Sequence, residues 1–363
     1  MSLADYYQKN RAAFKSSKVT PKTLLAKLIS SCFSFVSTLR SKAYEKGFFK
    51  SIKAEVPVVS IGNISIGGSG KTPFCILLAR ALQEKGIHFG FISKGYKGQM
   101  SKRLSKKEFL TVCASHGPMV PANSCGDEPY LIASKFPENP FVVSSNRVLA
   151  ANKAHLLGAE LVLMDDGFQH RRLIRDLDVV LVRAQDPLEG AAFFPRGGLR
   201  DSLCRLAEAD YVVVTGCDEV SFAKSRKCLA PYTQAPLIGV QSKFSKVTLF
   251  NGKSFDLKGK RVIAFAGTAH PEAFFKMLEE AGANVVLSAE LLDHAKIEGD
   301  FLYELELKVP SLGAEAIVCT EKDWVKLQHK NKSAILAYVS MEHEVLYGKG
   351  TFKELLTQIE SLF

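Results

Sequence analysis

The sequence predicts an α/β protein built around a mostly parallel sheet with helices on both faces. Two observations favour this class. Short apolar runs, which are typical of buried strands, alternate along the chain with amphipathic segments of helical periodicity. In addition, a glycine-rich segment at residues 65–72 directly follows the apolar run 56–61 and precedes a helical pattern. A strand, a glycine turn and a helix in this order are typical of parallel α/β folds.

The alternating pattern falls into two blocks separated by residues 236–260. Candidate strands of the first block lie at 58–61, 89–93, 141–144, 161–164, 179–182 and 211–215, and its helices are expected after Lys71, Glu128, Arg147 and Asp201. Candidate strands of the second block lie at 262–266, 285–287, 317–320 and 335–339, and its helices at 271–281, 321–328 and 351–362. Between the blocks, short alternating segments and an Asn251-Gly252 turn predict a hairpin-like linker.

A chain of 363 residues with 47% hydrophobic residues is long enough for two packed domains. We expect a basic amphipathic segment at 1–55, a larger α/β domain at 56–235, the linker at 236–260 and a smaller α/β domain at 261–363. The eight cysteines are scattered without a Cys-x-x-Cys pair. This spacing predicts neither a zinc site nor a disulfide framework, and it fits a reducing cytoplasm.

The net charge of +11 is concentrated near the N-terminus, where residues 1–60 carry eleven Lys and Arg against three acidic residues. An amphipathic helix is predicted within this stretch. Its apolar face consists of Leu25, Leu28, Ile29, Cys32, Val36 and Leu39, and its other face of Lys27, Ser30, Ser34, Ser37 and Ser41. The stretch lacks the roughly 20 apolar residues of a spanning helix and the small-residue cleavage site of a signal peptide.

Two roles suit this N-terminal helix equally well. Its apolar face, flanked by basic residues, could lie in a membrane interface that contains anionic lipid. Alternatively, the apolar face could pack into a protein core and leave the basic face in solvent. No recognised nucleic-acid-binding motif accompanies the basic residues, so we expect no nucleic acid partner.

The glycine-rich segment predicts a phosphate-binding loop of the P-loop NTPase type. It consists of Ser65, Ile66, Gly67, Gly68, Ser69, Gly70, Lys71 and Thr72. Such a turn directs backbone N–H groups to one point, where the positive end of the helix dipole also attracts an anion. Lys71 is then expected to reach the β- and γ-phosphates of a nucleotide and Thr72 to bind Mg²⁺. Ser65 occupies the usual position of the first glycine, while three later glycines keep the backbone freedom.

Two adjacent carboxylates, Asp165 and Asp166, follow the apolar run 161–164. Like charges at the end of a buried strand are costly without a cation, and a nucleotide kinase needs an acid there to hold the Mg²⁺ shell. We therefore predict that both residues contribute to a magnesium site. The polar side chains of Gln169 and His170 follow closely and could face phosphate or an acceptor.

Asp127 and Glu128 begin a predicted helix after Gly126. One of these acids could cap the helix, which leaves the other to accept a proton from an attacking hydroxyl, as the catalytic aspartate does in other kinases. His294, in an Asp293-His294 pair, could orient or share that proton. Sequence separation alone does not bring residues 127 and 294 together.

The motifs, taken in order along the chain, form a specific set. They are Ser60-Ile61-Gly62-Asn63, Gly67-Gly68-Ser69-Gly70-Lys71-Thr72-Pro73, Ser93-Lys94-Gly95-Tyr96, Gly126-Asp127-Glu128-Pro129, Asp165-Asp166-Gly167-Phe168-Gln169-His170, Pro195-Arg196-Gly197-Gly198-Leu199-Arg200-Asp201, Asp293-His294 and Thr320-Glu321-Lys322-Asp323. Over nearly the whole chain they closely resemble the tetraacyldisaccharide 4′-kinase family of lipid A biosynthesis. The glycine-rich motif alone is generic, but its combination with Asp-Asp-Gly-Phe-Gln-His is specific.

The resemblance implies a lipid-sugar kinase with ATP and Mg²⁺ as cofactors. The implied reaction transfers the ATP γ-phosphate to the 4′-hydroxyl of a tetraacylated glucosamine disaccharide 1-phosphate, which gives the 1,4′-bisphosphorylated lipid A precursor. The implied location is the cytoplasmic face of the bacterial inner membrane, with the N-terminal helix as a peripheral or monotopic contact at the membrane interface. No protein partner is indicated.

The resemblance also implies roles for particular residues. Lys71 and Thr72 would hold the triphosphate and the metal, and Asp165 and Asp166 would complete the metal site. Asp127 would be the base, paired with His294. The remaining motif positions implied near the reacting groups, as substrate-binding or supporting residues, are Glu128, Gln169, His170 and Arg200.

Three positions depart from the usual motifs of the family. Lys94 stands where arginine is commoner, and Asp201 replaces a usual glutamate. Ala295 follows Asp293-His294 where an aromatic residue or a second histidine is frequent. These changes concern the expected lid and acceptor site, while the expected nucleotide chemistry is unaffected.

Two other classes of protein share the glycine-rich loop. A small-metabolite kinase or an ATP-dependent ligase would need no basic amphipathic helix, and acceptor dependence would distinguish it from a lipid kinase. A membrane-associated nucleotide switch would turn over nucleotide without an acceptor. A guanine-specific switch is disfavoured because Thr320-Glu321-Lys322-Asp323 has glutamate where the guanine-binding motif needs lysine.

Overall fold

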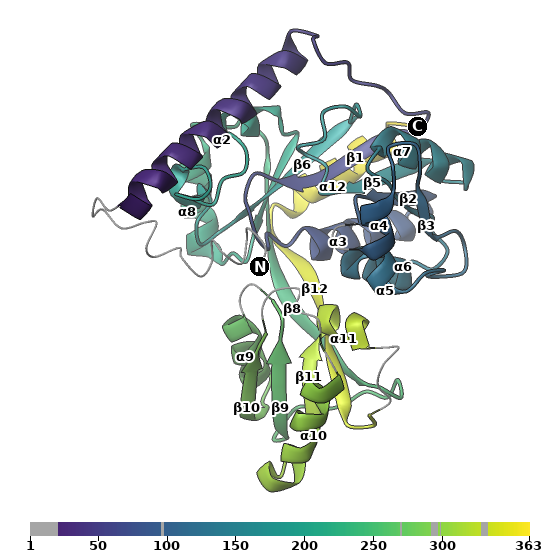
Figure 1. Cartoon of the computed structure of the whole chain (residues 1–363), viewed down its shortest axis with the longest axis vertical. Helices are drawn as coiled ribbons and strands as arrows, with labels where there is room; N and C mark the ends of the chain where they lie inside the picture. The colour runs from purple at the N-terminus through teal and green to yellow at the C-terminus, as the bar shows by residue number, and fades with distance from the viewer. Residues whose placement is uncertain (1–20, 96–97, 269–270, 292–296, 298, 328–332) are drawn as a thin grey trace. The chain divides into compact units, whose positions relative to one another are not determined.

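The computed structural model describes residues 21–363, except 96–97, 269–270, 292–296, 298 and 328–332 (Figure 1). The chain forms two compact units. Unit 1 extends to Ser242 and resumes with His343–Phe363, and unit 2 is the intervening segment Lys243–Glu342. Strands β8 (Leu237–Leu249) and β12 (Leu336–Tyr347) carry the chain from one unit to the other.

Unit 1 is built on a mostly parallel sheet, as the sequence predicts. Its other strands are β1 (Val58–Asn63), β2 (Phe89–Ser93), β3 (Leu110–Cys113), β4 (Phe141–Val143), β5 (Leu161–Asp165), β6 (Leu177–Arg183) and β7 (Tyr211–Thr215). They follow the order β8-β7-β6-β1-β5-β2-β4-β3. Neighbours are parallel except for β3, which runs antiparallel to β4 and has no counterpart among the expected strands. β1 is central and buried along its whole length.

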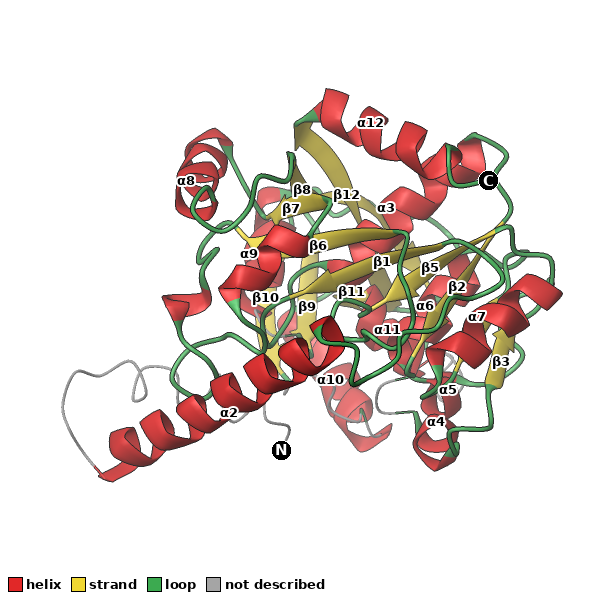
Figure 2. Cartoon of the chain, turned by 90° about the horizontal axis from the view of Figure 1, so that it is seen from above, coloured by secondary structure: helices red, strands yellow, loops and turns green. Residues whose placement is uncertain are grey.

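Helices cover both faces of this sheet (Figure 2). On one face, α3 (Lys71–Glu84) packs with α6 (Asp127–Lys135), and Phe91 of β2 contacts Phe136 after α6. On the opposite face, α7 (Arg147–Leu156) packs over β2, β4 and β5, in a cluster that includes Ile92. Phe91 and Ile92 point to opposite faces because side chains alternate along a strand.

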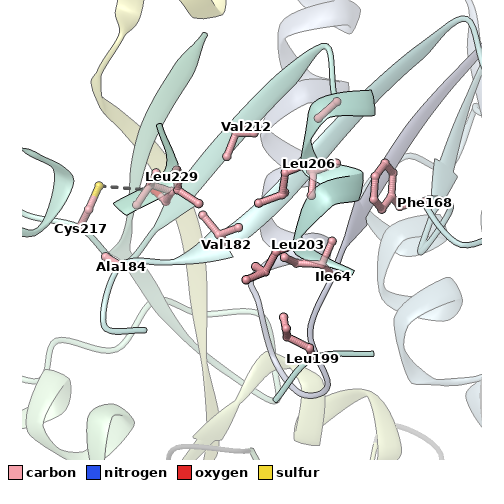
Figure 3. Close-up of a cluster of buried hydrophobic side chains, with 13 residues drawn as sticks. Ile64, Phe168, Val182, Ala184, Leu199, Leu203, Leu206, Val212, Cys217 and Leu229 are labelled. Atoms are coloured by element: carbon pink, nitrogen blue, oxygen red, sulfur yellow. Dashed lines mark hydrogen bonds between the residues drawn. The ribbon is translucent and has the colours of Figure 1, made fainter. Parts of the chain in front are cut away.

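Unit 1 contains further helices of different lengths. They are α2 (Pro21–Glu45), α4 (Gln99–Arg103), α5 (Ala122–Cys125), α8 (Glu219–Leu229), α12 (Lys349–Glu360) and the 3₁₀ segments η1 (Glu189–Ala191) and η2 (Leu203–Glu208). The segment η2 stands where a helix is expected after Asp201. Its Leu203 and Leu206 belong to an apolar cluster with Ile64, Phe168 and Leu199 (Figure 3). This cluster fixes the three loops that follow β1, β5 and η1.

Helix α2 is amphipathic as predicted, and its serine face contacts the rest of unit 1. Ser30 Oγ donates to the carbonyl of Phe193 over 2.8 Å, and Ser37 Oγ donates to Asp201 Oδ1 over 2.9 Å. Most of the large side chains of the apolar face, among them Leu28 and Val36, are more than half exposed, while Ile29 is partly buried. The alternative in which the apolar face packs into a core is therefore wrong. None of the described helices is long and apolar enough to cross a membrane.

The strands of unit 2 follow the order β10-β9-β11-β12, and neighbouring strands in this part of the sheet are parallel. Its strands besides β12 are β9 (Arg261–Ala266), β10 (Asn284–Glu290) and β11 (Ala316–Thr320), and its helices are α9 (Pro271–Glu280), α10 (Gly299–Leu312) and α11 (Glu321–Leu327). One apolar cluster surrounds Phe274 and Leu278 of α9. A second cluster surrounds Trp324, whose ring stacks on Tyr338 with 4.9 Å between centres.

The two units divide the chain differently from the expected domains. Within 236–260, β8 forms one long strand, and the Asn251-Gly252 turn follows it with a hydrogen bond of 2.9 Å from Gly252 N–H to the Leu249 carbonyl. α12 belongs to unit 1 rather than to a C-terminal domain that begins at residue 261. Its Gln358 accepts a hydrogen bond of 2.8 Å from Tyr211. An amphipathic pattern shows which face is buried but not which sheet it covers.

Candidate functional site

The glycine-rich loop, residues 65–70, connects the end of β1 to the start of α3. Gly67 and Gly70 have φ angles of 107° and 77°, in the left-handed region that favours glycine. Gly70 is also the N-cap of α3 and provides no side-chain cap. The first N–H groups of a helix are a favourable place for an anion when the capping residue offers them no acceptor. Lys71 and Thr72 are the first two residues of this helix, while Gly68 lies exposed in the loop.

Three segments of unit 1 hold the loop in place. Asn63 Nδ2 donates to Ser69 Oγ over 2.7 Å and to Ser65 Oγ over 3.2 Å. Thr215, at the end of β7, donates from Oγ1 to the Ser69 carbonyl over 3.2 Å. Ile66 N–H donates to the carbonyl of Gly198 over 2.7 Å. The loop is therefore preorganised by polar contacts to its own backbone and hydroxyls.

The two predicted acids lie at the same edge of the sheet as the glycine-rich loop. Asp165 is the last residue of β5 and pairs in register with Ile61 of β1. Asp166 follows with a left-handed φ of 55°, and its Oδ1 lies 3.5 Å from Lys71 Nζ. The Asp165 side chain is buried, and its Oδ1 has no hydrogen-bond partner among the residues that the structure describes. Carboxyl ends of parallel strands meet at one edge, which is why the sequence places these groups together.

The two neighbouring carboxylates have opposite electrostatic environments. Burial raises the pKa of Asp165 to about 7, and the negative charge of Glu128 adds to this effect while Lys71 opposes it. For Asp166, desolvation alone would raise the pKa, but the charges of Arg200 and Lys71 hold it well below its usual range. Asp166 is thus a firmly ionised partner of two cations, whereas for Asp165 burial and the charge of Glu128 outweigh the attraction of Lys71.

Arg200 joins the acid pair to the end of β1. Its guanidinium donates to both carboxylate oxygens of Asp166, over 2.5 Å and 3.2 Å, and also to Asn63 Oδ1. The backbone N–H of Arg200 donates to the Ile64 carbonyl over 2.9 Å, which fixes the loop that carries it. Bidentate geometry of this kind is the strong form of an arginine–carboxylate pair. The structure therefore brings Lys71, Asp166 and Arg200 together, as the motif positions predict.

Asp127 and Glu128 begin α6, but neither is its N-cap. That position is held by Gly126, whose φ of 107° requires glycine and which makes no side-chain cap. The charge of Glu128 is close enough to raise the pKa of Asp165, after the larger effect of burial. Both acids belong to the first turn of a helix, where the helix dipole favours negative charge.

Gln169 and His170 differ in their surroundings. Gln169 Nε2 donates to the Asn63 carbonyl over 2.7 Å and so ties the loop after β5 to the end of β1. Burial and nearby arginines, Arg147 first among them, lower the pKa of His170 to about 3, so its ring is neutral. His170 Nε2 has no hydrogen-bond partner. Gly62 permits this arrangement, since a Cβ there would lie 2.5 Å from Cβ of Phe168.

Several sequence-predicted positions stand apart from this cluster. His294 and Ala295 lie outside the described residues, so no geometry joins Asp127 to His294. Lys94 is exposed at the end of β2. Asp201 is buried, pairs with Arg205 and accepts the hydrogen bond from Ser37 of α2. Asp201 thus anchors α2 and η2 to unit 1.

Two residues of the cluster were missed by the sequence reasoning. Asn63 contacts the glycine-rich loop, Arg200 and Gln169 at once. Arg147 is a buried cation whose pKa falls to about 10 because desolvation outweighs the attraction of Asp166 and Asp165. Both residues directly follow or end elements at the carboxyl edge of the sheet. A search for polar residues at that edge would have found them.

The sheet, the glycine-rich loop at the start of α3 and the carboxylates at the end of β5 define an α/β protein of the nucleotide-binding class. A family model described as tetraacyldisaccharide-1-P 4′-kinase matches residues 22–360. The chain belongs to this family.

Known relatives and a solved structure agree with this assignment. A tetraacyldisaccharide 4′-kinase of Chlamydia abortus is 33% identical over 98% of this chain and 96% of the relative. A tetraacyldisaccharide 4′-kinase of Pelobacter propionicus is 34% identical over 90% of this chain and 89% of the relative. The crystal structure described as the "apo" form of LpxK from Aquifex aeolicus in complex with ATP has a TM-score of 0.71 and 29% identity, and the match covers 93% of this chain and 99% of that one.

Proposed function

We propose that this chain transfers the γ-phosphate of ATP to the 4′-hydroxyl of a tetraacyldisaccharide 1-phosphate in lipid A biosynthesis. The product is the 1,4′-bisphosphorylated lipid A precursor. The observation that carries the proposal is the cluster of Lys71, Asp166 and Arg200 beside a preorganised glycine-rich loop, in a chain that belongs to the kinase family. Phosphoryl transfer depends mainly on positioning and on neutralising charge, and this cluster supplies both.

The nucleotide is proposed to bind at the glycine-rich loop and the start of α3. The loop N–H groups and the helix dipole would bind the β-phosphate, and Lys71 would reach the β- and γ-phosphates. Arg200 is held by Asp166 and Asn63 at the same edge of the sheet, where it can stabilise charge on the transferring group.

Thr72, Asp165 and Asp166 are proposed to be the residues that would hold Mg²⁺. The environment of Asp165 fits a divalent cation, because its buried Oδ1 lacks a partner and its pKa is raised to about 7 by burial. Magnesium in kinases takes one or two carboxylates together with phosphates and water. When bound, the ion would neutralise the charge on the phosphates.

The buried charge of Asp165 predicts a conflict between stability and activity. Because its pKa rises from 3.8 to about 7 on folding, the stability that protonation of Asp165 contributes is complete below pH 3.8 and is lost as pH rises to about 7. At pH 8, without metal or nucleotide, Asp165→Asn should be more stable than wild type by about 1–2 kcal/mol. Its kinase activity should be lost.

Thermal denaturation in a chelator tests this expectation at two pH values. The stability of Asp165→Asn should exceed that of wild type by more at pH 8 than at pH 5, because the wild-type carboxyl of the folded protein is mostly protonated at pH 5. Asp186→Asn provides a control at a partly exposed carboxylate away from the acid pair. A stability difference that is equal at the two pH values would contradict the assigned environment of Asp165.

Asp127 is proposed as the base that accepts the proton of the 4′-hydroxyl, with His294 as the residue that shares or orients it. Asp127 lies in the first turn of α6, beside Glu128, whose negative charge contributes to the raised pKa of Asp165. In this scheme the hydroxyl oxygen attacks the γ-phosphorus, the bond to the β,γ-bridging oxygen breaks, and the proton passes to Asp127. Neutral His170 and Gln169 are proposed to support the acceptor side.

The acceptor lipid is proposed to reach the site from a membrane surface, with α2 at the interface of the cytoplasmic face of the inner membrane. This contact is supported by the exposed apolar face of α2 and by the serine hydrogen bonds that hold the opposite face on unit 1. Basic residues around the helix would attract anionic lipid. We propose that residues 1–55 serve membrane contact, that the glycine-rich loop and its neighbouring elements in unit 1 bind the nucleotide, and that His294 contributes to the acceptor side.

Charged substitutions on the exposed face of α2 should weaken membrane binding without unfolding the protein. Leu28 and Phe35 are 65% and 68% exposed, so Leu28→Asp with Phe35→Asp should leave the melting temperature unchanged. Loss of two large apolar contacts, about 3 kcal/mol together, should lower affinity for anionic vesicles by roughly 100-fold. Vesicle co-sedimentation measures this change.

A matched double variant separates membrane contact from general surface effects. Val220 and Leu307 are 78% and 61% exposed on other helices, and Val220→Asp with Leu307→Asp adds the same charge. This control should bind vesicles like wild type. Equal loss of binding in both double variants would show that net charge, and not the α2 face, governs the effect.

Acceptor dependence of ATP turnover tests the kinase proposal against its two alternatives. We expect ATP turnover to be slow until a tetraacyldisaccharide 1-phosphate is supplied in mixed micelles, and to rise in proportion to that lipid. Stimulation by a small polar metabolite instead would favour the small-molecule kinase or ligase class. Fast turnover without any acceptor would favour the nucleotide switch.

A further inference from the structure

A buried histidine packs against the glycine-rich loop. His343 lies in β12 and is the first residue of that strand that belongs to unit 1. Its side chain is only 6% exposed. A Cβ at Gly70 would lie 2.9 Å from Cε1 of His343 and 3.4 Å from its Nε2. The edge of the imidazole therefore fills the space directly beside the Gly70 backbone.

The chemistry of this histidine is unusual for a residue with a packing role alone. Its Nδ1 is buried and has no hydrogen-bond partner within the described part of the chain. Desolvation lowers the pKa of the ring to about 4, so the ring is neutral at physiological pH. A buried polar atom without a partner costs free energy that an apolar residue at the same place would avoid.

Thr215 lies on the same side of the Gly70 backbone as His343. Cγ2 of Thr215 would lie 3.4 Å from a Cβ at Gly70, and its Oγ1 donates to the carbonyl of the preceding residue, Ser69, over 3.2 Å. Gly70 has a φ of 77° and a ψ of 20° and is the residue immediately before Lys71. A small change in φ and ψ of Gly70 would change the direction of the first N–H groups of α3 and of the Lys71 side chain.

We propose that His343 is a positioning residue for the nucleotide, which acts by packing its imidazole, beside Thr215, against Gly70 and so holding Gly70 in its left-handed conformation. The proposal rests on the proposed function and adds to it a residue from the strand that links unit 2 to unit 1. The ring contributes shape rather than charge. Its absence leaves Gly70 free to sample other conformations, and the loop then loses part of its preorganisation for the triphosphate.

Binding of a non-hydrolysable ATP analogue, measured by calorimetry, tests the proposal independently of the acceptor. His343→Ala should bind the analogue about 10-fold more weakly than wild type, while His343→Phe, which restores a ring, should bind within about threefold. In turnover assays His343→Ala should raise KM for ATP by a similar factor and leave KM for the lipid unchanged. The analogue result stands even if the lipid proves not to be the acceptor.

A matched control in the same strand separates positioning from stability. Tyr347 also belongs to the unit 1 part of β12 and stacks on Phe222 with 5.0 Å between ring centres. Tyr347→Ala should lower the melting temperature but leave affinity for the analogue unchanged. The proposal is overturned if His343→Ala binds the analogue like wild type, if His343→Phe binds as weakly as His343→Ala, or if Tyr347→Ala loses the same affinity.

Discussion

Replacement of Lys71 with alanine is expected to lower kcat/KM for ATP by about 1,000-fold or more, with losses in both nucleotide affinity and turnover. Lys71 is the first residue of α3, and its ammonium lies 3.5 Å from Asp166 at the edge of the sheet where the phosphates are proposed to bind. The fold should survive, because Asp166 keeps its bidentate pair with Arg200. Steady-state kinetics and analogue binding measure the two losses separately.

Lys85→Ala is a suitable control for the loss of a lysine at α3. Lys85 is the C-cap of the same helix and pairs with Glu360 at 2.7 Å on the surface. An exposed ion pair of this kind contributes little to stability, so this variant should retain wild-type kinetics. If Lys71→Ala kept more than about a tenth of the wild-type kcat/KM, the role of the loop lysine in phosphoryl transfer would be excluded.

Asp127→Ala is expected to lower kcat by about 100- to 10,000-fold, which is the usual contribution of a general base. Because Asp127 is proposed to act on the acceptor hydroxyl, KM for ATP and affinity for an ATP analogue should change little. This pattern differs from that of Lys71→Ala, in which both quantities are damaged. Single-turnover measurements with saturating ATP would show the loss in the chemical step itself.

Two further variants sharpen the test of Asp127. Asp127→Asn keeps the size of the side chain and should be as slow as Asp127→Ala, since an amide does not accept the proton. Glu138→Ala removes an exposed acid just beyond the end of α6 and should be fully active. Normal turnover of Asp127→Asn would exclude Asp127 as the base and would make Glu128 the next candidate.

The nucleotide half of the candidate site could be predicted from the sequence because its parts are local. The run 56–61, the glycine-rich segment and the following helix are contiguous, and the structure has β1, the loop and α3 in that order. Asp165 and Asp166 were predicted as metal ligands because two like charges follow a buried strand, and the structure has Asp165 at the end of β5 with Asp166 directly after it. Arg200, 34 residues from Asp166, was assigned only by its motif, yet it pairs with that carboxylate.

Other features depend on contacts between distant segments and leave no local pattern. The periodicity of α2 identifies an apolar and a serine-rich face, but the hydrogen bonds from Ser30 and Ser37 decide that the serine face is the attached one. In the same way, the pattern of α12 shows an apolar face without showing that it belongs to unit 1. In the sequence nothing distinguishes His343 from other strand residues. Only the structure shows that it packs beside Gly70.

The central claim is tested most directly by following the label of γ-labelled ATP into the lipid. Wild-type protein is incubated with a tetraacyldisaccharide 1-phosphate in mixed micelles, with and without Mg²⁺, and compared with Asp127→Ala. We predict Mg²⁺-dependent label in the lipid as a phosphate at the 4′ position, and its loss in the variant. Bound ATP with no label in the lipid under any of these conditions would contradict the account.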